Sequence, residues 1–518
     1  MKYIKLIALS ILAIVMTNCE LDTFPHDSLS KDDFGTLANI QLLSTGIYSQ
    51  LSSGDDQLYL SYCNHSSDDF AKLNRIANKE PGSFTTNVFD LLSNGTNSWP
   101  IWKGCYKSIH TCNVVIGANS FGTNAEMNNS LAEMYFLRAY NYYILSTLFT
   151  RPYTQKDISD LGLPMRLDPD DASEASRSTI DVLYQQMISD LKIASLYMSP
   201  LTTNRTKASK QAAQALLARI YNSMLQPTNP DAAIASNALL YADSVLLNSG
   251  GKVAMVTSAV TFFGSATVAR TQWPSKTTHY FQAASGSTET IFMLIRPSVI
   301  SLSGCLDYEY NQSKSGQYLP LSNDYYDMLN KYPTDLRNNL IDKSYTTPTG
   351  TTLSLADAAY NARSTNCNKY SFQGGILNLG STIVLRATEM CLIKAEIYAK
   401  QGNVSEALKN INLVRKRAGV PEFTEANWTA NAYGITNLLD LVLNEKRLEM
   451  VGENLRRNDM YRNKKDIIRM YGFDSSNYLE TYPAGGTGTI SRWDSKVIIT
   501  AIPYGQMLQS PNMVQNPY

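Results

Sequence analysis

Residues 383–419 read IVLRATEMCLIKAEIYAKQGNVSEALKNINLVRKRAG, and this stretch decides the fold. Its apolar residues recur at the spacing of one helix face, first before and then after Gly402 and Asn403. Gly419 stands just after the last of these apolar residues, where glycine is typical of a helix C-terminal stop. We therefore expect a helix, a short turn at Gly402 and a second helix that ends at Gly419.

Small and large apolar residues in this stretch fall at the spacing of a tetratricopeptide unit. The small residues let two helices approach closely, and the larger ones lock the pair. The segment 216–224, LLARIYNSM, is similar to the first helix of the same unit. Tetratricopeptide-like pairs are therefore expected to recur, although ordinary antiparallel helices are the alternative for any single pair. The residues at this spacing are Ala395, Tyr398, Gly402, Ala407, Ile411 and Val414.

Helical periodicity also covers most of the N-terminal half. Segment 130–149 is apolar around most of its circumference, so neighbours should cover it on several sides. Ser178 or Thr179 is a suitable N-cap for a helix that follows. In a further helix, Cys105, Ile109 and Cys112 share one face. The expected helices are 34–52, 102–118, 130–149, 179–197, 207–225 and 230–247.

Residues 250–380 have a different composition, rich in Gly, Ser and Thr, with short β-type runs such as TIFMLI at 290–295. Residues 472–500 are similarly rich in loop-forming residues. A long insertion of this kind in a compact domain is usually functional. The predicted fold is therefore mainly α, a scaffold of paired helices that carries a loop-rich insertion with short β-hairpins.

The N-terminus has the pattern of an export signal. Lys2 and Lys5 precede an apolar run from Leu6 to Met16, which is shorter than the roughly 20 residues that a membrane-spanning helix needs. This run has the length of a signal-peptide core. Residues 1–18 are therefore predicted to be a signal peptide.

The first cysteine gives that signal a more specific interpretation. Met16-Thr17-Asn18-Cys19 resembles a lipobox, in which the cysteine thiol receives a diacylglycerol before cleavage. Several acyl chains on one residue anchor a protein stably to a membrane. We expect Cys19 to be lipidated and residues 19–33 to form a polar tether. A plain signal peptide with an incidental cysteine is the alternative.

The charge composition bears on the kind of partner that the protein binds. The 518 residues include 45 basic and 45 acidic side chains, and without residues 1–18, which hold two lysines, 43 basic residues remain. A surface this close to neutral argues against nucleic acid as a partner. The 32 tyrosines are an unusually large share, suited to core packing and to a ligand groove.

A search for catalytic chemistry finds no set of residues above background. The sequence has no H-E-x-x-H, G-x-S-x-G or Walker motif, and GGTG at 485–488 reads as a turn. No catalytic residue, metal site or cofactor is therefore predicted. A glycoside hydrolase remains an alternative because it needs only two suitably spaced carboxylates. The four scattered histidines are His26, His65, His110 and His279.

Four segments together are similar to the SusD/RagB-like nutrient-binding outer-membrane lipoproteins. They are the lipobox at Cys19, the helix pair at 392–420, the charged stretch LVLNEKRLEMVGENLRRNDMYR at 441–462, and the ending AIPYGQMLQSPNMVQNPY at 501–518. Asn454 stands where the family usually has glycine. In order and spacing, the four segments span nearly the whole chain.

The resemblance implies about four tetratricopeptide-like units and a position outside the cell. Members lie as a lid on a SusC-like TonB-dependent transporter in the outer membrane and deliver an oligosaccharide, or in some members a peptide. Glu20 and Asp22 fit the signal that sends such lipoproteins to the cell surface. The expected divisions after the tether are a helical scaffold at 34–249, the insertion at 250–380, a helix pair at 381–420 and a SusD-like region at 421–518.

The charged stretch at 441–462 favours a structural role. Glu445, Glu449 and Glu453 are four residues apart, which would place them on one helix face, and Arg456 follows. A guanidinium can hold several carboxylates and carbonyls together. We expect an internal ion-pair network that clamps the C-terminal segment to the helices.

Ligand contacts are expected on loops, where an aromatic ring can stack on a sugar and amides or carboxylates can bind its hydroxyls. The segment NGTNSWPIW at 94–102 is the first candidate, because family members place ligand contacts in the loop before this helix; Trp102 itself is expected in the core. For each aromatic, packing or a partner contact is the alternative. The predicted ligand-binding residues are Asp68, Asp69, Arg75, Asn97, Trp99, Trp273, Tyr308 and Tyr310.

Overall fold

A computed structural model describes most of the chain. The described residues are 34–52, 59, 62–64, 66–70, 99–169, 176–264, 280–296, 321–342, 344–346, 352–354, 366–367, 369–370, 380–469 and 489–516. The predicted signal peptide, the predicted lipidation site Cys19 and the predicted tether lie outside these residues.

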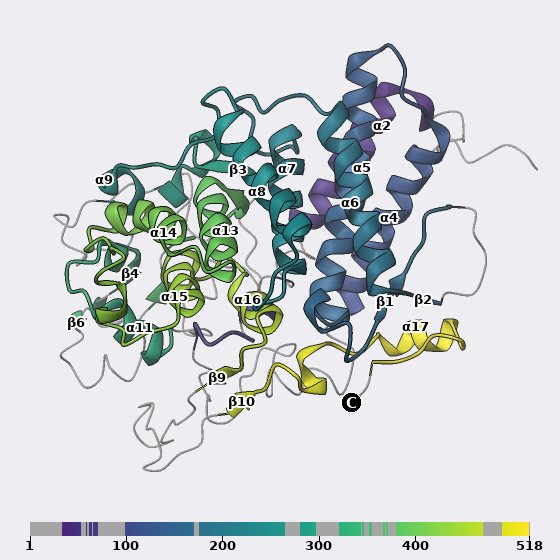
Figure 1. Ribbon diagram of the computed structural model, residues 1–518. Helices are drawn as coiled ribbons and strands as arrows, with labels where there is room; N and C mark the ends of the chain where they lie inside the picture. Colours follow the sequence, from purple (N-terminus) through teal and green to yellow (C-terminus); the bar gives the residue numbers. More distant parts are fainter. Residues whose placement is uncertain are drawn as a thin grey trace, which may run out of the picture.

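Paired helices dominate the structure, as predicted. In the N-terminal half, α5 packs against α4 and α6, α6 packs against α7, and α7 packs against α8. Figure 1 shows α2 and α4–α6 side by side in one half of the molecule, with α7 and α8 at its centre. The bounds are α2 Leu37–Gln50, α4 Trp99–Ala118, α5 Ala125–Phe149, α6 Ile180–Tyr197, α7 Lys210–Met224 and α8 Ala232–Leu247.

The C-terminal helices continue this arrangement. Helix α13 packs against α14, α8 and α15, so the C-terminal half joins directly onto the N-terminal helices. The predicted helix pair is confirmed as α13 and α14, with its turn at Gly402. Its predicted start at residue 383 is wrong, because residues 383–386 belong to the strand Thr382–Arg386, which pairs with residues 290–294. The bounds are α13 Ala387–Lys400, α14 Val404–Ala418, α15 Leu438–Met450, α16 Arg456–Arg462 and α17 Tyr504–Gln509.

Capping side chains set the helix starts. The Thr179 side chain accepts from the Val182 amide, so α6 begins where predicted. Helix α5 begins five residues earlier than predicted, because the Asn124 side chain accepts from the amides of Glu126 and Met127. Polar residues in the first turn of α5 hid this start from the apolar pattern.

The largest hydrophobic cluster joins α2, α4–α8 and α13. In α5, 18 of 25 residues are buried, which confirms the prediction of neighbours on several sides. Trp102 is 2% exposed, as expected for a core residue. The described cysteines are buried: Cys63, Cys105, Cys112, Cys367 and Cys391.

The described strands form antiparallel pairs of two. Strand β3 pairs with β8, which joins the insertion to the helix pair that follows it. The hairpin β5–β6 and the pair β4–β7 lie within the insertion, as predicted. The bounds are β1 Leu161–Pro164, β2 Arg177–Thr179, β3 Thr290–Leu294, β4 Ile341–Asp342, β5 Ser344–Thr346, β6 Thr352–Ser354, β7 Asn366–Cys367, β8 Thr382–Arg386, β9 Ile467–Arg469 and β10 Thr489–Ser491.

Short helices complete the insertion and the loops. They are α9 Ala259–Phe263 and α11 Asn323–Leu329, with 3-10 turns η3 Tyr153–Gln155, η4 Tyr280–Gln282, η5 Ala284–Gly286, η6 Leu336–Leu340, η8 Trp428–Ala430 and η9 Lys496–Ile498.

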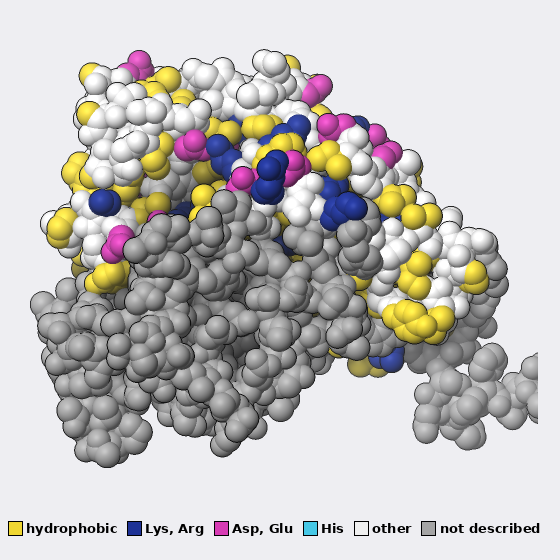
Figure 2. Space-filling model, turned by 90° about the horizontal axis from the view of Figure 1, so that it is seen from below, with side chains coloured by type: hydrophobic (Ala, Val, Ile, Leu, Met, Phe, Trp, Pro, Cys, Tyr) yellow, Lys and Arg dark blue, Asp and Glu magenta, His cyan; other side chains and the backbone are white. Residues whose placement is uncertain are grey.

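The surface mixes both charge signs. Figure 2 shows the face seen from below, where Lys and Arg side chains lie among Asp, Glu and hydrophobic side chains. This mixture agrees with the nearly neutral composition. Among the described helices, none combines the length and the apolar character needed to cross a bilayer.

Two glycines of the α13–α14 pair allow a matched test of the fold. Gly402 and Gly419 both have left-handed backbone, with φ of 74° and 71°. A Cβ at Gly402 would meet open space, whereas one at Gly419 would lie 3.2 Å from Leu336 Cδ1. We expect Gly402→Ala to lower the free energy of unfolding by about 1 kcal/mol and Gly419→Ala by about 2–3 kcal/mol. Both substitutions place a Cβ on left-handed backbone, but only the second also brings that Cβ too close to Leu336. Urea unfolding measures both, and equal losses would contradict the packing at Gly419.

Candidate functional site

Helix α15 carries many charges into the interior. Every residue of α15 except Asp440 is buried. An unpaired charge in such a place costs several kcal/mol, so each ionised group needs a partner. The contacts of Glu445, Glu449 and the nearby Glu453 show which cations are the partners of these buried carboxylates.

Glu445 joins α15 to α14 and to the insertion. Its carboxylate lies 2.7 Å from Arg337 Nη1 and 2.8 Å from Arg415 Nη1. Arg337 also binds Asp335 at 2.6 Å, so two guanidinium groups face two carboxylates. The Arg415 guanidinium lies 3.7 Å from the centre of the Phe423 ring, which adds a cation–π contact.

Glu449 and Glu453 bind a second set of cations. Arg386 and Arg417 lie 3.0 and 2.7 Å from Glu449. Arg386 and Lys369 each lie 2.7 Å from Glu453. Burial opposes ionisation, but the attraction of these cations outweighs it and lowers the pKa of both glutamates. The predicted internal ion-pair network is therefore confirmed.

The geometry of the network differs in one respect from the prediction. Glu453 does not share a helix face with Glu445 and Glu449, because α15 ends at Met450. Gly452 and Asn454 have φ of 75° and 68°, so the chain turns sharply before α16. Asparagine tolerates left-handed backbone better than most residues, which explains how Asn454 can replace the family's usual glycine.

A further ionic cluster joins α16 to α13. Arg462 lies 2.6 Å from both Glu396 and Asp459. Lys446 of α15 lies 2.9 Å from Asp459. Lys400 lies 3.2 Å from Glu396 and donates to the Leu225 carbonyl at 2.9 Å. Complete burial lowers the pKa of Lys400 to about 8, despite the attraction of Glu396.

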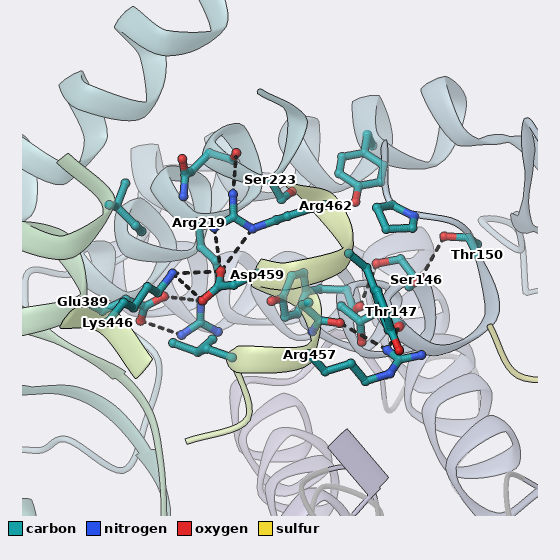
Figure 3. A pocket seen from close by; sticks show the side chains of 18 of the residues that line it. Ser146, Thr147, Thr150, Arg219, Ser223, Glu389, Lys446, Arg457, Asp459 and Arg462 are labelled. Atoms are coloured by element: carbon teal, nitrogen blue, oxygen red, sulfur yellow. Dashed lines mark hydrogen bonds and ion pairs between the residues drawn. The ribbon is translucent and has the colours of Figure 1, made fainter. Parts of the chain in front are cut away.

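A polar cavity lies beside this cluster, between α5, α6, α7 and α16 (Figure 3). The cavity has a volume of about 50 Å³, which is enough for a few water molecules. Figure 3 shows Arg219, Glu389, Lys446, Asp459 and Arg462 grouped at one end, and Thr147 and Arg457 at the other.

The charged groups of the cavity are engaged with the protein itself. Arg219 binds Glu389 at 2.6 Å, and Asp459 is held by Lys446 and Arg462. Arg457 donates to the Thr147 carbonyl in the last turn of α5, where a cation is favourable. Both carboxylates that line the cavity are therefore ion-paired, an arrangement typical of a structural cluster. The cavity can hold water or a small polar molecule.

Asp68 and Asp69, two of the predicted ligand contacts, are buried and bound by arginines. Arg456 donates two hydrogen bonds of 2.8 Å to Asp68, and Arg447 Nε donates to Asp69 at 2.9 Å. Burial raises the pKa of Asp69 to about 6. For Asp68, Arg447 and Arg456 outweigh burial and lower the pKa. Both carboxylates thus have structural partners, and their contact with a ligand stays a prediction.

The side chains of the other predicted ligand residues lie outside the described part of the structure. Trp99 is the first residue of α4, but its side chain is not described. Arg75, Asn97, Trp273, Tyr308 and Tyr310 lie outside the described residues. In the part of the chain that is described, no group of three or more His, Cys, Asp or Glu side chains is suited to a metal.

Most cationic partners of the network were not predicted. The three glutamates were predicted, but their partners Arg337 and Lys369 come from the insertion, and Arg386 comes from β8. Arg415 and Arg417, from the last turn of α14, were not predicted as partners either. No local spacing relates these residues to α15, so tertiary structure alone reveals the pairs.

Comparison with protein families identifies the chain. Residues 21–222 match the SusD-like_3 family, described as starch-binding and associating with the outer membrane. Residues 306–518 match the SusD_RagB model of the SusD family. The chain belongs to the SusD/RagB-like family. Members of this family are outer-membrane-associated binding proteins, so the resemblance drawn from four motifs is confirmed.

Solved SusD-like structures have the same fold. A SusD superfamily protein from Bacteroides thetaiotaomicron matches with a TM-score of 0.72 at 24% identity, over 93% of this chain and 100% of that one. A SusD-like carbohydrate-binding protein from Bacteroides vulgatus matches with a TM-score of 0.69 at 17% identity, over 92% and 97%. The surface glycan-binding protein A from Bacteroides uniformis matches with a TM-score of 0.63 at 19% identity, over 93% and 99%. No curated protein sequence matches the chain.

Removing one glutamate tests the stabilising role of the network. Glu449→Ala should lower the free energy of unfolding by about 3–5 kcal/mol, because Arg386 and Arg417 would keep buried charges with fewer partners. As the matched control, Glu406→Ala removes a surface pair with Lys409 and should cost less than about 1 kcal/mol. Chemical denaturation measures both, and a loss at Glu449 as small as that at Glu406 would contradict the role.

Lys400 should make stability depend on pH. Its folded pKa of about 8 lies below the ordinary value of 10.5, so between these pH values the unfolded state binds more protons. Stability from this residue therefore rises as pH rises from about 8 to 10.5, by about 3 kcal/mol at 1.36 kcal/mol per unit. Because other groups titrate in the same range, the quantity to measure is the difference in unfolding free energy between the native protein and Lys400→Met. A difference that stays constant across this range would refute the lowered pKa.

Proposed function

We propose that this protein captures a glycan outside the cell and passes it to a SusC-like TonB-dependent transporter in the outer membrane. The observation that carries the proposal is its membership of the SusD/RagB-like family, one model of which is described as starch-binding. Two of the similar solved structures are of a carbohydrate-binding protein and a surface glycan-binding protein. Lipidation of Cys19 would tether the protein to that membrane, facing outward.

The scaffold supports this role because it fixes the start of α4, the helix that begins with Trp99. Trp102, one turn after Trp99, packs edge-on against Phe149 with ring centres 4.8 Å apart. Its indole nitrogen also donates to Gln506 at 3.3 Å. The start of α4 is thus fixed to α5 and α17. A rigid support of this kind lowers the entropy that a neighbouring ligand-binding residue loses on binding.

The proposal is binding without catalysis. The two carboxylates of the described cavity are held in ion pairs, as are Asp68 and Asp69. A glycoside hydrolase needs one carboxyl group able to donate a proton and a second to act as base or nucleophile. Incubating the purified protein with oligosaccharides and measuring new reducing ends separates the two functions, and steady release of reducing ends would favour the hydrolase.

Truncation of Trp99 tests glycan binding directly. We expect Trp99→Ala to weaken the affinity for the oligosaccharide that binds the native protein by roughly tenfold, because a lost aromatic contact is worth about 1–2 kcal/mol. Isothermal titration calorimetry, with a panel of neutral oligosaccharides and of peptides, measures the affinity.

The control is Trp428→Ala, which removes a partly buried tryptophan of η8 that packs against the hydrophobic cluster shared by α13, α14 and α15. It should leave the affinity unchanged while lowering stability. If the two substitutions changed the affinity equally, Trp99 would not be a ligand-binding residue. Binding of the peptides in place of the oligosaccharides would change the cargo from glycan to peptide.

A further inference from the structure

The polar cavity between α5, α6, α7 and α16 carries more positive than negative charge (Figure 3). Four cations and two carboxylates line it, so two positive charges are in excess. Glu389 is paired with Arg219, and Asp459 is shared by two cations, Lys446 and Arg462. Because both carboxylates are already paired, the interior of the cavity favours a negative charge.

Arg457 is the cavity cation that has no carboxylate partner among the described residues. Its Nη1 donates to the Thr147 carbonyl, and its Nη2 donates to the Ile498 carbonyl. Nε is left over from these contacts. Carbonyl groups compensate a full charge only in part, and Arg457 is 3% exposed, so water compensates little of the remainder. An anion in the cavity would supply the missing charge.

Further donors that line the cavity remain available. Arg219 uses Nε and Nη2 for a carboxylate and a carbonyl, which leaves Nη1. The Arg219 guanidinium lies 5.7 Å from the centre of the Tyr143 ring. Within the described structure, the Tyr143 hydroxyl and Asn458 Nδ2 have no hydrogen-bond partner. Burial raises the pKa of Tyr143 to about 12, so its hydroxyl keeps its proton and can donate.

One acceptor is left over beside these donors. Asn222 lines the cavity and is 2% exposed, and its Oδ1 has no partner in the described part of the chain. Buried polar groups without a protein partner commonly bind water or an ion. Hydrogen phosphate offers several acceptor oxygens and one O–H donor, which matches this set of groups. Sulfate at neutral pH offers acceptors alone.

We propose that this cavity binds one inorganic phosphate ion. The volume of about 50 Å³ suits a free ion of this size and is too small for a sugar ring or for the phosphate group of a larger molecule. The lining residues come from α5 and α7 on one side and from α15 and α16 on the other. A bound phosphate would therefore stabilise the junction between the N-terminal and C-terminal helices.

Isothermal titration calorimetry on the full folded chain, in a buffer free of phosphate and sulfate, tests the site. Phosphate should bind as one ion per chain and raise the melting temperature, because a ligand that binds only the folded state stabilises it. Sodium chloride at the same ionic strength should do neither. Sulfate should bind more weakly than phosphate, because it cannot donate to Asn222.

Two substitutions locate the bound ion. Tyr143→Phe removes only a hydroxyl that has no partner within the described structure, and it should weaken phosphate binding by about tenfold without lowering stability in phosphate-free buffer. Asn458→Asp replaces a donor with a negative charge and should weaken binding by at least about tenfold. The fold should tolerate this aspartate, because Arg457 Nη1 lies 3.3 Å from Asn458 Oδ1 and can pair with it.

The matched control is Tyr106→Phe. The Tyr106 hydroxyl donates to the Pro164 carbonyl at 3.0 Å, away from the cavity, so its loss should lower stability and leave phosphate affinity unchanged. Phosphate binding that both cavity variants weaken, and the control does not, would support the site. Undiminished binding in both cavity variants would show an adventitious ion only, and no binding by the native protein would also overturn the proposal.

Two more outcomes are decisive. If sulfate binds as tightly as phosphate, the part assigned to Asn222 is wrong. If Tyr143→Phe fails to fold, Asn458→Asp still decides the location of the ion, provided that its melting temperature in phosphate-free buffer is close to that of the native protein. The titrations contain no oligosaccharide, so their result is independent of glycan binding.

Discussion

The burial of ionised side chains along α15 is the constraint on which the rest of the structure depends. Glu445 and Glu449 cannot enter the interior singly, because a buried carboxylate without a cation is too costly. The chain supplies arginines from α14, from β8 and from the insertion. These contacts hold α14, β8 and the insertion close to α15. The helix thus joins parts of the chain that are distant in sequence.

This arrangement differs from a core held together only by hydrophobic contacts. A hydrophobic surface accepts many partners, whereas a guanidinium fork accepts carboxylates in a narrow range of positions. The N-terminal helices use mainly hydrophobic packing, and the Arg138–Asp190 pair is one ionic exception there. The C-terminal region, which has short helices and long connections, depends more on ionic contacts. Its geometry is therefore specific even where regular structure is sparse.

The scaffold and the candidate ligand residues have separate roles. Similar solved structures share the fold at identities of 17 to 24%, so the helix pairs tolerate extensive substitution. Fold alone does not decide cargo, which is set by the residues that touch it. In the described part of the chain, Trp102 packs on Phe149 near the start of α4, and Arg447 joins Asp69 to α11.

The sequence by itself determined the helices, their pairing at 383–419, the buried face of Cys105 and Cys112, and the family. These features follow from local periodicity, turn residues and ordered motifs, which depend on neighbours along the chain. It also indicated an ionic role for Glu445 and Glu449, because charges at helical spacing need partners. Only the tertiary structure decided which arginines those partners are, that Glu453 lies beyond a turn, and that Asp68 and Asp69 are bound by Arg456 and Arg447. The physical reason is that an ion pair depends on distance in space, and residues separated by more than 300 positions leave no pattern along the chain that would relate them.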